Sequence, residues 1–179
     1  MRGLLFFFFW LQSQLFAYTY NTFLLDMEEE LYPKILTFWK DLPQRVGDDR
    51  IDFLVIYDEV DANVAENICR KLTQKVKRLR GFAFAPQAAS SKDFFHIDLS
   101  SVDVVWVLKL DEEMARKIAQ KTLQYSILTF VYDVKDLRYG FLIGVDLRKE
   151  VQIYINRSTL LRSRFSFVET FYQIARFME

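Results

Sequence analysis

The sequence has very few of the residues from which metal sites and disulfides are built. Its 179 residues include one cysteine, Cys69, and one histidine, His96. Two such side chains are too few for a zinc or iron site, and a lone thiol has no partner for an internal disulfide. We therefore expect no bound metal. Cys69 lies beside Ile68 on an apolar stripe and is expected to pack in the core, and His96 is expected to be structural.

An excess of charge of one sign is also lacking. Lys and Arg number 24 and Asp and Glu number 24, so the formal net charge at pH 7 is zero. Without a basic excess the chain has little with which to neutralise a phosphate backbone, and we expect no nucleic-acid partner. Glycine occurs five times, and Gly140 and Gly144 are too isolated to form a phosphate-binding loop. No cofactor is expected.

Apolar residues, by contrast, are abundant. Hydrophobic residues make up 51% of the chain and aromatic residues 17%, far from the composition of a disordered segment. A chain of this length corresponds to about one domain. Since no linker, repeat or block of charge divides it, we predict a single domain.

The first residues predict export. Arg2 is followed by an apolar run over residues 4–11, a short polar stretch and the small residue Ala17, which is the layout of a secretory signal peptide. The run is about half of the roughly 20 residues that a membrane span needs. We predict a signal peptide over residues 1–17 and an exported mature domain over residues 18–179. An uncleaved anchor and a buried N-terminal helix are the alternatives.

The mature chain alternates short apolar runs with helical patterns. Continuous rather than alternating apolar runs are typical of parallel strands buried on both faces. We therefore predict a three-layer α/β sandwich, with a mainly parallel sheet, an antiparallel hairpin at one edge and helices on both faces. The expected strands are residues 51–57, 82–85, 102–108 and 127–132, the hairpin is 141–146 with 151–155, and the helices are 22–42, 61–79 and 111–123.

The remaining segments are assigned less regular structure. Residues 87–100 are predicted to form a polar connection, the longest irregular stretch of the chain. Residues 158–177 are predicted to be helical in two pieces. Ser166 and Glu169 have the spacing of a capping box, so the second piece is expected to begin there.

A family resemblance emerges in the C-terminal sequence. The segment 151–176 resembles the closing signature of the YfiR family, with a strand ending in Ile155 and Asn156, a short helix, a turn residue at Phe165, and a last helix ending in Ile174, Ala175 and Arg176. Lys34–Ile35–Leu36 and the pair Gly140–Phe141 also resemble family positions. The chain departs from the pattern at Arg164, where members usually carry Gly, and at Val168 and Glu169, where they carry a pair of serines.

The resemblance implies a small exported regulator with a periplasmic location rather than an enzyme. YfiR-like proteins restrain a membrane-bound diguanylate cyclase through its periplasmic sensing domain and thereby lower cyclic-di-GMP in the cell. The resemblance thus implies a stoichiometric protein partner of this kind. The candidate contact residues, aromatic and basic residues near the predicted hairpin and the last helices, are Tyr139, Phe141, Tyr154, Asn156, Arg157, Arg162 and Arg164. The aromatic C-terminal region is also compatible with a homodimer.

A second hypothesis is a small-molecule binding module of a transporter or sensor kinase. In an open parallel sheet, ligands bind at the carboxyl ends of the strands. Asp58, Lys109 and Asp133 each follow a predicted strand and would meet there. The alternative is that they are ordinary caps and solvated loop ends. An enzyme is the weakest hypothesis, because His96 lacks the sequence context of a catalytic base.

Overall fold

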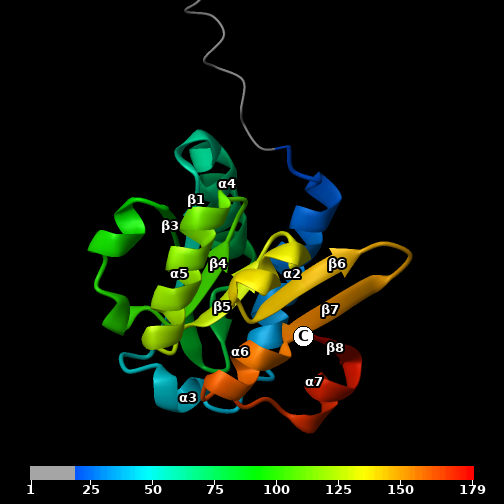
Figure 1. The fold of residues 1–179 in the computed structure, drawn as a ribbon. Helices are drawn as coiled ribbons and strands as arrows, with labels where there is room; N and C mark the ends of the chain where they lie inside the picture. Colours follow the sequence, from blue (N-terminus) through cyan, green and yellow to red (C-terminus); the bar gives the residue numbers. More distant parts are fainter. Residues whose placement is uncertain (1–18) are drawn as a thin grey trace, which may run out of the picture.

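The computed structural model describes residues 19–179, so the predicted signal peptide lies outside the described part of the chain. These residues form an eight-stranded sheet in the order β2-β3-β1-β4-β5-β6-β7-β8 (Figure 1). The strands are β1 (Arg50–Tyr57), β2 (Arg78–Leu79), β3 (Phe82–Ser90), β4 (Val104–Val107), β5 (Leu128–Val131), β6 (Ile143–Leu147), β7 (Val151–Asn156) and β8 (Ala175–Met178). The α-helices are α2 (Thr22–Leu36), α3 (Leu42–Arg45), α4 (Ala62–Lys75), α5 (Glu112–Gln124), α6 (Arg157–Arg162) and α7 (Glu169–Ile174).

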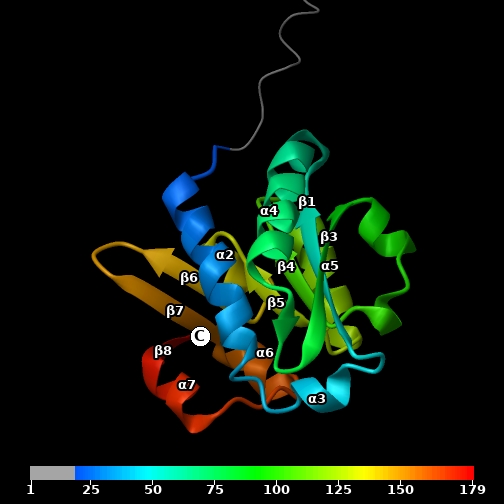
Figure 2. The same cartoon turned by 180° about the vertical axis from the view of Figure 1, so that it is seen from behind.

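The helices cover both faces of the sheet. Helices α2 and α4 lie on one face, as Figure 2 shows, and α5 lies on the other (Figure 1). Strands β3, β1, β4, β5 and β6 run parallel, and β6 and β7 form the antiparallel hairpin. The predicted three-layer α/β sandwich is confirmed.

Alternate side chains of the central strands enter two separate cores. In β4, Val104 and Trp106 join the core beneath α2 and α4, whereas Val105 and Val107 join the core beneath α5. All four are buried. A strand covered on both faces needs apolar residues at every position, which is why these strands are continuous apolar runs in the sequence.

Helix α2 is held to α4 by ion pairs as well as by apolar packing. The Glu29 side chain is almost completely buried, and its two carboxylate oxygens lie 3.1 Å from Lys71 Nζ and 3.2 Å from Lys75 Nζ. Asp26 also pairs with Lys71, at 2.7 Å. Because a buried carboxylate is stable only when its charge is paired, these contacts fix how the two helices lie on the sheet.

Two predicted helices end earlier than expected. Helix α2 ends at Leu36 rather than at residue 42, because Trp39 is buried and forms a β-bridge with Phe167. Helix α4 ends at Lys75 rather than at residue 79, because the chain then forms the short strand β2. The turn to β3 has positive φ at Arg80 and Gly81 (50° and 95°), as tight hairpin turns require.

The predicted polar connection 87–100 is partly a strand. Strand β3 continues to Ser90, pairing with β1 along eight residues, and two 3-10 turns follow, η2 (Asp93–His96) and η3 (Leu99–Ser101). Phe94 and Leu99 from these turns are buried in the core beneath α5. Sequence patterning missed this extension because the strand residues after Ala85 are polar or small.

The C-terminal segment differs most from the prediction. Helices α6 and α7 are present, but residues 175–178 are strand β8, which pairs parallel with β7. The hairpin is therefore not at the edge of the sheet, because β8 lies beyond it. The predicted capping box is also wrong, since the residue at the N-cap of α7 is Val168 and its side chain makes no capping hydrogen bond. Among residues 19–179, no helix has the length and apolar character that a membrane crossing would require.

Candidate functional site

The carboxyl ends of the parallel strands meet at the edge of the sheet where α2 begins (Figure 1). From β1 the chain passes through α4 to β3 on one side, and then crosses to β4 on the other side of β1. Such a reversal opens a crevice between the two strand ends, and ligands of open α/β sheets bind in it. We refer to this crevice, between the ends of β1 and β4, as the switch-point crevice.

The switch-point crevice is occupied by the chain's own Tyr20. The Tyr20 hydroxyl donates a hydrogen bond to Asp61 Oδ2 (2.8 Å) and accepts one from the backbone N–H of Lys109 (3.3 Å). Asp61 ends the 3-10 turn η1 (Glu59–Asp61) after β1, and Lys109 follows β4. Burial and the neighbouring Asp61 carboxylate raise the pKa of the Tyr20 phenol well above its usual value, so this hydroxyl stays protonated.

Further contacts hold the segment around Tyr20 in place. The Tyr20 ring packs edge-on against Tyr132 with 4.8 Å between centroids, and Lys109 Nζ lies 5.3 Å from both ring centroids. Lys109 Nζ also donates to the carbonyl oxygen of Thr19 (2.5 Å), and the backbone N–H of Asn21 donates to the Tyr132 hydroxyl (2.7 Å). The segment from Thr19 to Asn21 is thus held against the strand ends through its backbone and through the ring and hydroxyl of Tyr20. No pattern in the sequence indicated this role for Tyr20.

Next to this segment lies an open hollow of about 360 Å³. It brings together two of the three predicted ligand residues, Lys109 and Asp133, at the ends of β4 and β5. The hollow contains three basic and two acidic side chains. Its lining residues are Leu24, Lys109, Tyr132, Asp133, Val134, Lys135, Val145, Asp146 and Arg148.

The third predicted ligand residue, Asp58, does not join the other two. Its carboxylate faces the backbone N–H of Val60 (3.5 Å) at the start of η1, and it does not line the hollow. Strand β4 lies between β1 and β5, which separates Asp58 from Asp133. Of the three predicted ligand residues, the structure therefore brings together only Lys109 and Asp133. Asp133 also begins the 3-10 turn η4 (Val134–Tyr139), by accepting a hydrogen bond from Lys135 N (2.9 Å).

A buried polar pair lies between α2 and the sheet. The Tyr32 hydroxyl is 2.7 Å from the carbonyl oxygen of Val131 and 2.9 Å from Glu28 Oε1. One hydroxyl proton cannot serve two acceptors, so a protonated Glu28 carboxyl that donates to Tyr32 satisfies both contacts. Burial raises the pKa of Glu28 well above its usual value, which agrees with this arrangement. No pattern in the sequence indicated that Glu28 is buried, because it stands in a run of acidic residues.

Two predicted partner contacts are corrected by their burial. Phe141 is completely buried in the core beneath α5, so it has no surface to offer another protein. Asn156 is also buried and begins helix α6. Its Oδ1 accepts from Thr159 N (2.8 Å) and its Nδ2 donates to the carbonyl oxygen of Leu137 (2.6 Å). Asn156 therefore has a structural role, as a helix cap that joins α6 to η4.

The other predicted contact residues lie at or near the surface. Arg157, Arg162 and Arg164 are exposed, and Arg157 pairs with Glu179 (3.2 Å). Tyr139 is half-buried, with the guanidinium groups of Arg116 and Arg138 4.9 and 4.7 Å from its ring centroid. Tyr154 is half-buried on β7 and packs against the core beneath α5. The structure thus distributes these residues over η4, β7, α6 and the loop after α6 rather than placing them all in one patch.

Sequence reasoning missed several exposed apolar residues of the last three elements. Leu161 on α6 is 77% exposed, Ile174 on α7 is 53% exposed and Phe177 on β8 is 49% exposed. Exposed apolar side chains near arginines are common at protein interfaces. We call this region the C-terminal surface. It comprises the exposed side chains of α6, α7 and β8, namely Arg157, Leu161, Arg162, Ile174, Arg176 and Phe177, although the consecutive β8 residues Arg176 and Phe177 point to opposite faces of the sheet.

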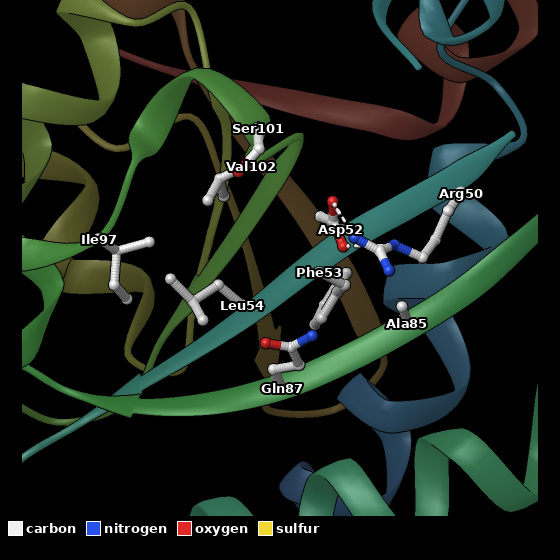
Figure 3. A pocket seen from close by; sticks show the side chains of 9 residues that line it. All are labelled: Arg50, Asp52, Phe53, Leu54, Ala85, Gln87, Ile97, Ser101 and Val102. Carbon is white, nitrogen blue, oxygen red and sulfur yellow. Dashed lines mark hydrogen bonds and ion pairs between the residues drawn. The ribbon is translucent and has the colours of Figure 1, made fainter. Parts of the chain in front are cut away.

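A further hollow, of about 190 Å³, lies near the amino end of β1 (Figure 3). Phe53, Leu54 and Val102 form its apolar part, and Arg50 pairs with Asp52 at 2.9 Å beside it. Asp103 accepts a hydrogen bond from the backbone N–H of Asp52 (3.0 Å) and lies 3.5 Å from Arg45 Nε. Burial raises the pKa of Asp103 to about 6. The charged groups of this region pair with one another, and no sequence motif pointed to it.

The two residues considered for reactivity have ordinary surroundings. Cys69 is partly buried against the core beneath α2 and α4, and burial raises the pKa of its thiol to about 12. The thiol is therefore protonated at neutral pH and a poor nucleophile. The expected core packing of Cys69 is confirmed, although the side chain is not fully covered. His96 is exposed at the end of η2.

Comparisons with known proteins identify the fold. No family model and no curated protein matches the chain. A conserved domain protein from Vibrio cholerae O1 biovar El Tor is similar in structure, with a TM-score of 0.60 and 13% identity over 87% of this chain. An ABC domain from Streptococcus pneumoniae, solved in complex with L-Trp, has a TM-score of 0.52 and 10% identity over 80% of this chain. The chain spans 60% of the length of each, and at these identities the likeness concerns the fold alone.

Proposed function

We propose that this protein is an exported regulatory binding protein that restrains a membrane-bound signalling enzyme, as YfiR-like proteins restrain a diguanylate cyclase. One contrast carries the proposal. The crevice in which this fold class binds small ligands contains the chain's own Tyr20, while the C-terminal surface exposes apolar side chains. The segment that carries the family resemblance, residues 151–176, contributes most of this surface.

The proposed mechanism is stoichiometric. The C-terminal surface would cover the periplasmic domain of the enzyme and bind its inactive state more tightly than its active state. Only such a difference in affinity shifts an equilibrium between two states. Leu161, Ile174 and Phe177 offer exposed apolar side chains, and Arg157 and Arg162 on α6 offer exposed charges, and both kinds of side chain are common at protein interfaces.

Site-specific photocrosslinking in the native host tests this proposal. The full-length chain would carry the photoreactive residue p-benzoylphenylalanine in place of Phe177 in one strain and in place of Tyr125 in a control strain. Tyr125 at the end of α5 is a matched control, because it is also aromatic and has a similar exposure, 41%. We expect an adduct with a membrane-bound cyclase from position 177 and none from position 125.

A second variant separates binding from folding. Arg157→Glu should abolish the adduct while changing the melting temperature very little, because Arg157 and Glu179 are exposed partners. Equal adducts from positions 177 and 125, or no cyclase adduct from position 177, would overturn the proposal.

A second candidate function is a small-molecule binding module. The observation that favours it is the hollow lined by Lys109 and Asp133 at the strand ends. A structural neighbour that was solved with L-Trp supports the same idea, because it combines a related fold with an amino-acid ligand. Under this proposal the protein would report the presence of a small solute to a transporter or sensor kinase.

A further inference from the structure

We propose that the open hollow at the ends of β4, β5 and β6 binds a small carboxylic acid with an aliphatic chain, held by the ammonium groups of Lys109 and Lys135 and by the Tyr132 hydroxyl. This inference rests on the second candidate function, because it names the ligand class for the same hollow. The volume of the hollow, about 360 Å³, lies at the lower end of the range of small-molecule pockets, about 300–1,000 Å³. This size suits a small molecule.

Three cations reach the hollow from consecutive strands of the sheet. Lys109 follows β4, Lys135 lies in η4 after β5, and Arg148 follows β6. Because β4, β5 and β6 are parallel neighbours, their carboxyl ends bring these side chains to one edge. The acidic lining residues are Asp133 and Asp146, and Arg148 pairs with Asp146 at 2.7 Å. The two lysines are then left with one carboxylate, so the lining has one surplus positive charge.

The neighbouring contacts leave the two lysines able to bind an anion. Asp136 and Arg138 of η4 have opposite charges and interact with each other, so they do not remove the surplus. Within the part of the chain that the structure describes, Lys109 Nζ donates one hydrogen bond, to the carbonyl oxygen of Thr19, and Lys135 Nζ donates none. An ammonium group has three donors, and its hydrogen bond to a carboxylate is stronger than one to a neutral carbonyl.

The Tyr132 hydroxyl supplies a neutral donor at the same place. Tyr132 lines the hollow and is only 5% exposed. Its hydroxyl oxygen accepts a hydrogen bond from the backbone N–H of Asn21 (2.7 Å), and its proton has no acceptor among the described residues. Burial raises the pKa of this phenol, so the proton is retained at neutral pH. A carboxylate oxygen would give this buried proton the acceptor that it lacks.

Apolar side chains form the rest of the lining. Leu24 on α2, Val134 in η4 and Val145 on β6 contribute aliphatic surface. An aliphatic chain that covers this surface removes it from water, which is favourable. The lining therefore matches a carboxylate at one end of the ligand and a short aliphatic chain at the other. A zwitterion is a poorer match, because its ammonium group would lie near the two lysines and would leave the surplus charge uncompensated.

Isothermal titration calorimetry of the purified full chain tests the inference with three related probes. The probes are 4-methylpentanoate, L-leucine and 3-methylbutylamine, which share a branched chain but carry a carboxylate, both charges and an ammonium group, respectively. We expect 4-methylpentanoate to bind at least about tenfold more tightly than L-leucine, and 3-methylbutylamine to show no binding. Equal binding of 4-methylpentanoate and L-leucine, or tighter binding of the amine, would overturn the inference.

Two variants connect the binding to the named donors. Lys135→Met removes an exposed cation and should weaken binding of 4-methylpentanoate by at least about tenfold. Lys40→Met is the matched control, because Lys40 is also exposed but lies beyond the other end of α2, away from the hollow. It should bind like the wild type. Tyr132→Phe keeps the ring and should weaken binding about two- to tenfold. Wild-type affinity in both Lys135→Met and Tyr132→Phe would overturn the inference.

Asp133→Asn distinguishes a carboxylate from a zwitterion within the protein. An asparagine retains the Oδ1 atom that accepts the hydrogen bond from Lys135 N, so the start of η4 is kept. The substitution removes a negative charge beside the ligand carboxylate. Asp133→Asn should therefore bind 4-methylpentanoate at least as tightly as the wild type. A clear loss of affinity would show that the acid attracts a cationic group of the ligand, which contradicts the inference.

A small-molecule extract of the native host separates failure of this inference from failure of the second candidate function. Leu24→Trp places a larger side chain in the wall of the hollow, and Phe23→Trp, at the neighbouring exposed position, is its control. If 4-methylpentanoate does not bind, but the extract raises the melting temperature of the wild type and Phe23→Trp and not that of Leu24→Trp, the function stands with a ligand of another class. If the extract shifts none of them, both fail. The regulator proposal is tested separately, by crosslinking at the C-terminal surface.

Discussion

The switch-point crevice and the C-terminal surface lie on the same sheet but differ in how their contacts are satisfied. At the crevice, Tyr20 is held by two hydroxyl contacts, an aromatic ring and a lysine. At the C-terminal surface, Leu161, Ile174 and Phe177 leave much of their apolar area in water. A region that satisfies its own groups gains little from a partner, whereas exposed apolar area becomes favourable when a partner covers it. This difference is the reason for placing the proposed partner contact at the C-terminal surface.

The largest expected change in stability comes from comparing a buried and an exposed phenylalanine of the C-terminal region. Phe171 on α7 is fully buried beside Phe167, whereas Phe177 on β8 is about half exposed. Phe171→Ala should lower the free energy of unfolding by about 3–5 kcal/mol, through lost burial and a cavity. Phe177→Ala should cost less than about 1 kcal/mol, and chemical denaturation of both variants checks this. Equal losses would mean that Phe177 is structural and would remove the distinction between core and contact surface.

The next largest loss of stability is expected at the buried pair Glu28 and Tyr32, between α2 and the sheet. Tyr32→Phe removes the hydroxyl that reaches both Glu28 and the carbonyl oxygen of Val131. Leaving buried polar groups without this partner should cost about 2 kcal/mol. Urea denaturation against the wild type measures the loss. An unchanged free energy of unfolding would show that the packing of α2 on the sheet does not depend on this hydroxyl.

The same pair predicts how stability changes with pH. Burial raises the pKa of Glu28, so the folded state holds its proton at pH values where the unfolded state releases it. Above the usual Glu range this should lower the free energy of unfolding by about 1.4 kcal/mol per pH unit, until the folded carboxyl also ionises. Glu28→Gln cannot ionise and should lose this part of the slope. Parallel slopes for the two proteins between pH 5 and pH 8 would contradict a protonated Glu28.

The hydroxyl of Tyr20 predicts the smallest effect. Tyr20→Phe should lower the free energy of unfolding by about 1 kcal/mol, the usual net contribution of a partly buried hydrogen bond. Thermal unfolding at pH 7 measures it, with Phe23→Ala as an exposed aromatic control. A loss as large as that of Phe171→Ala would make Tyr20 part of the core.

The sequence predicted the central part of the fold because its signals there are local. The continuous apolar runs of β1, β4 and β5 and the amphipathic pattern of α5 lie within single elements. Strand β8 was missed because its sequence, Ala175–Met178, is not strand-like and pairs with β7 from 22 positions away. Strand β2 was missed for a similar reason, since it exists only as the partner of β3.

The candidate sites were predictable to a smaller extent. Lys109 and Asp133 meet as expected because both follow parallel strands, whose ends share one edge of the sheet. Asp58 follows another such strand, but strand order keeps it from that hollow. The burial of Phe141 and Asn156 could not be seen in the sequence, because apolar and capping residues occur both in cores and at interfaces.

The sequence by itself determined the α/β class and the pattern of strands and helices, because periodic apolar residues must be buried on one or two faces wherever the elements pack. Only the tertiary structure decided which strands became neighbours, which residues were left exposed, and that Tyr20 lies against Asp61 and Lys109. These contacts join residues 41 and 89 positions apart. Packing of whole elements, rather than the preference of any short segment, brings such residues together.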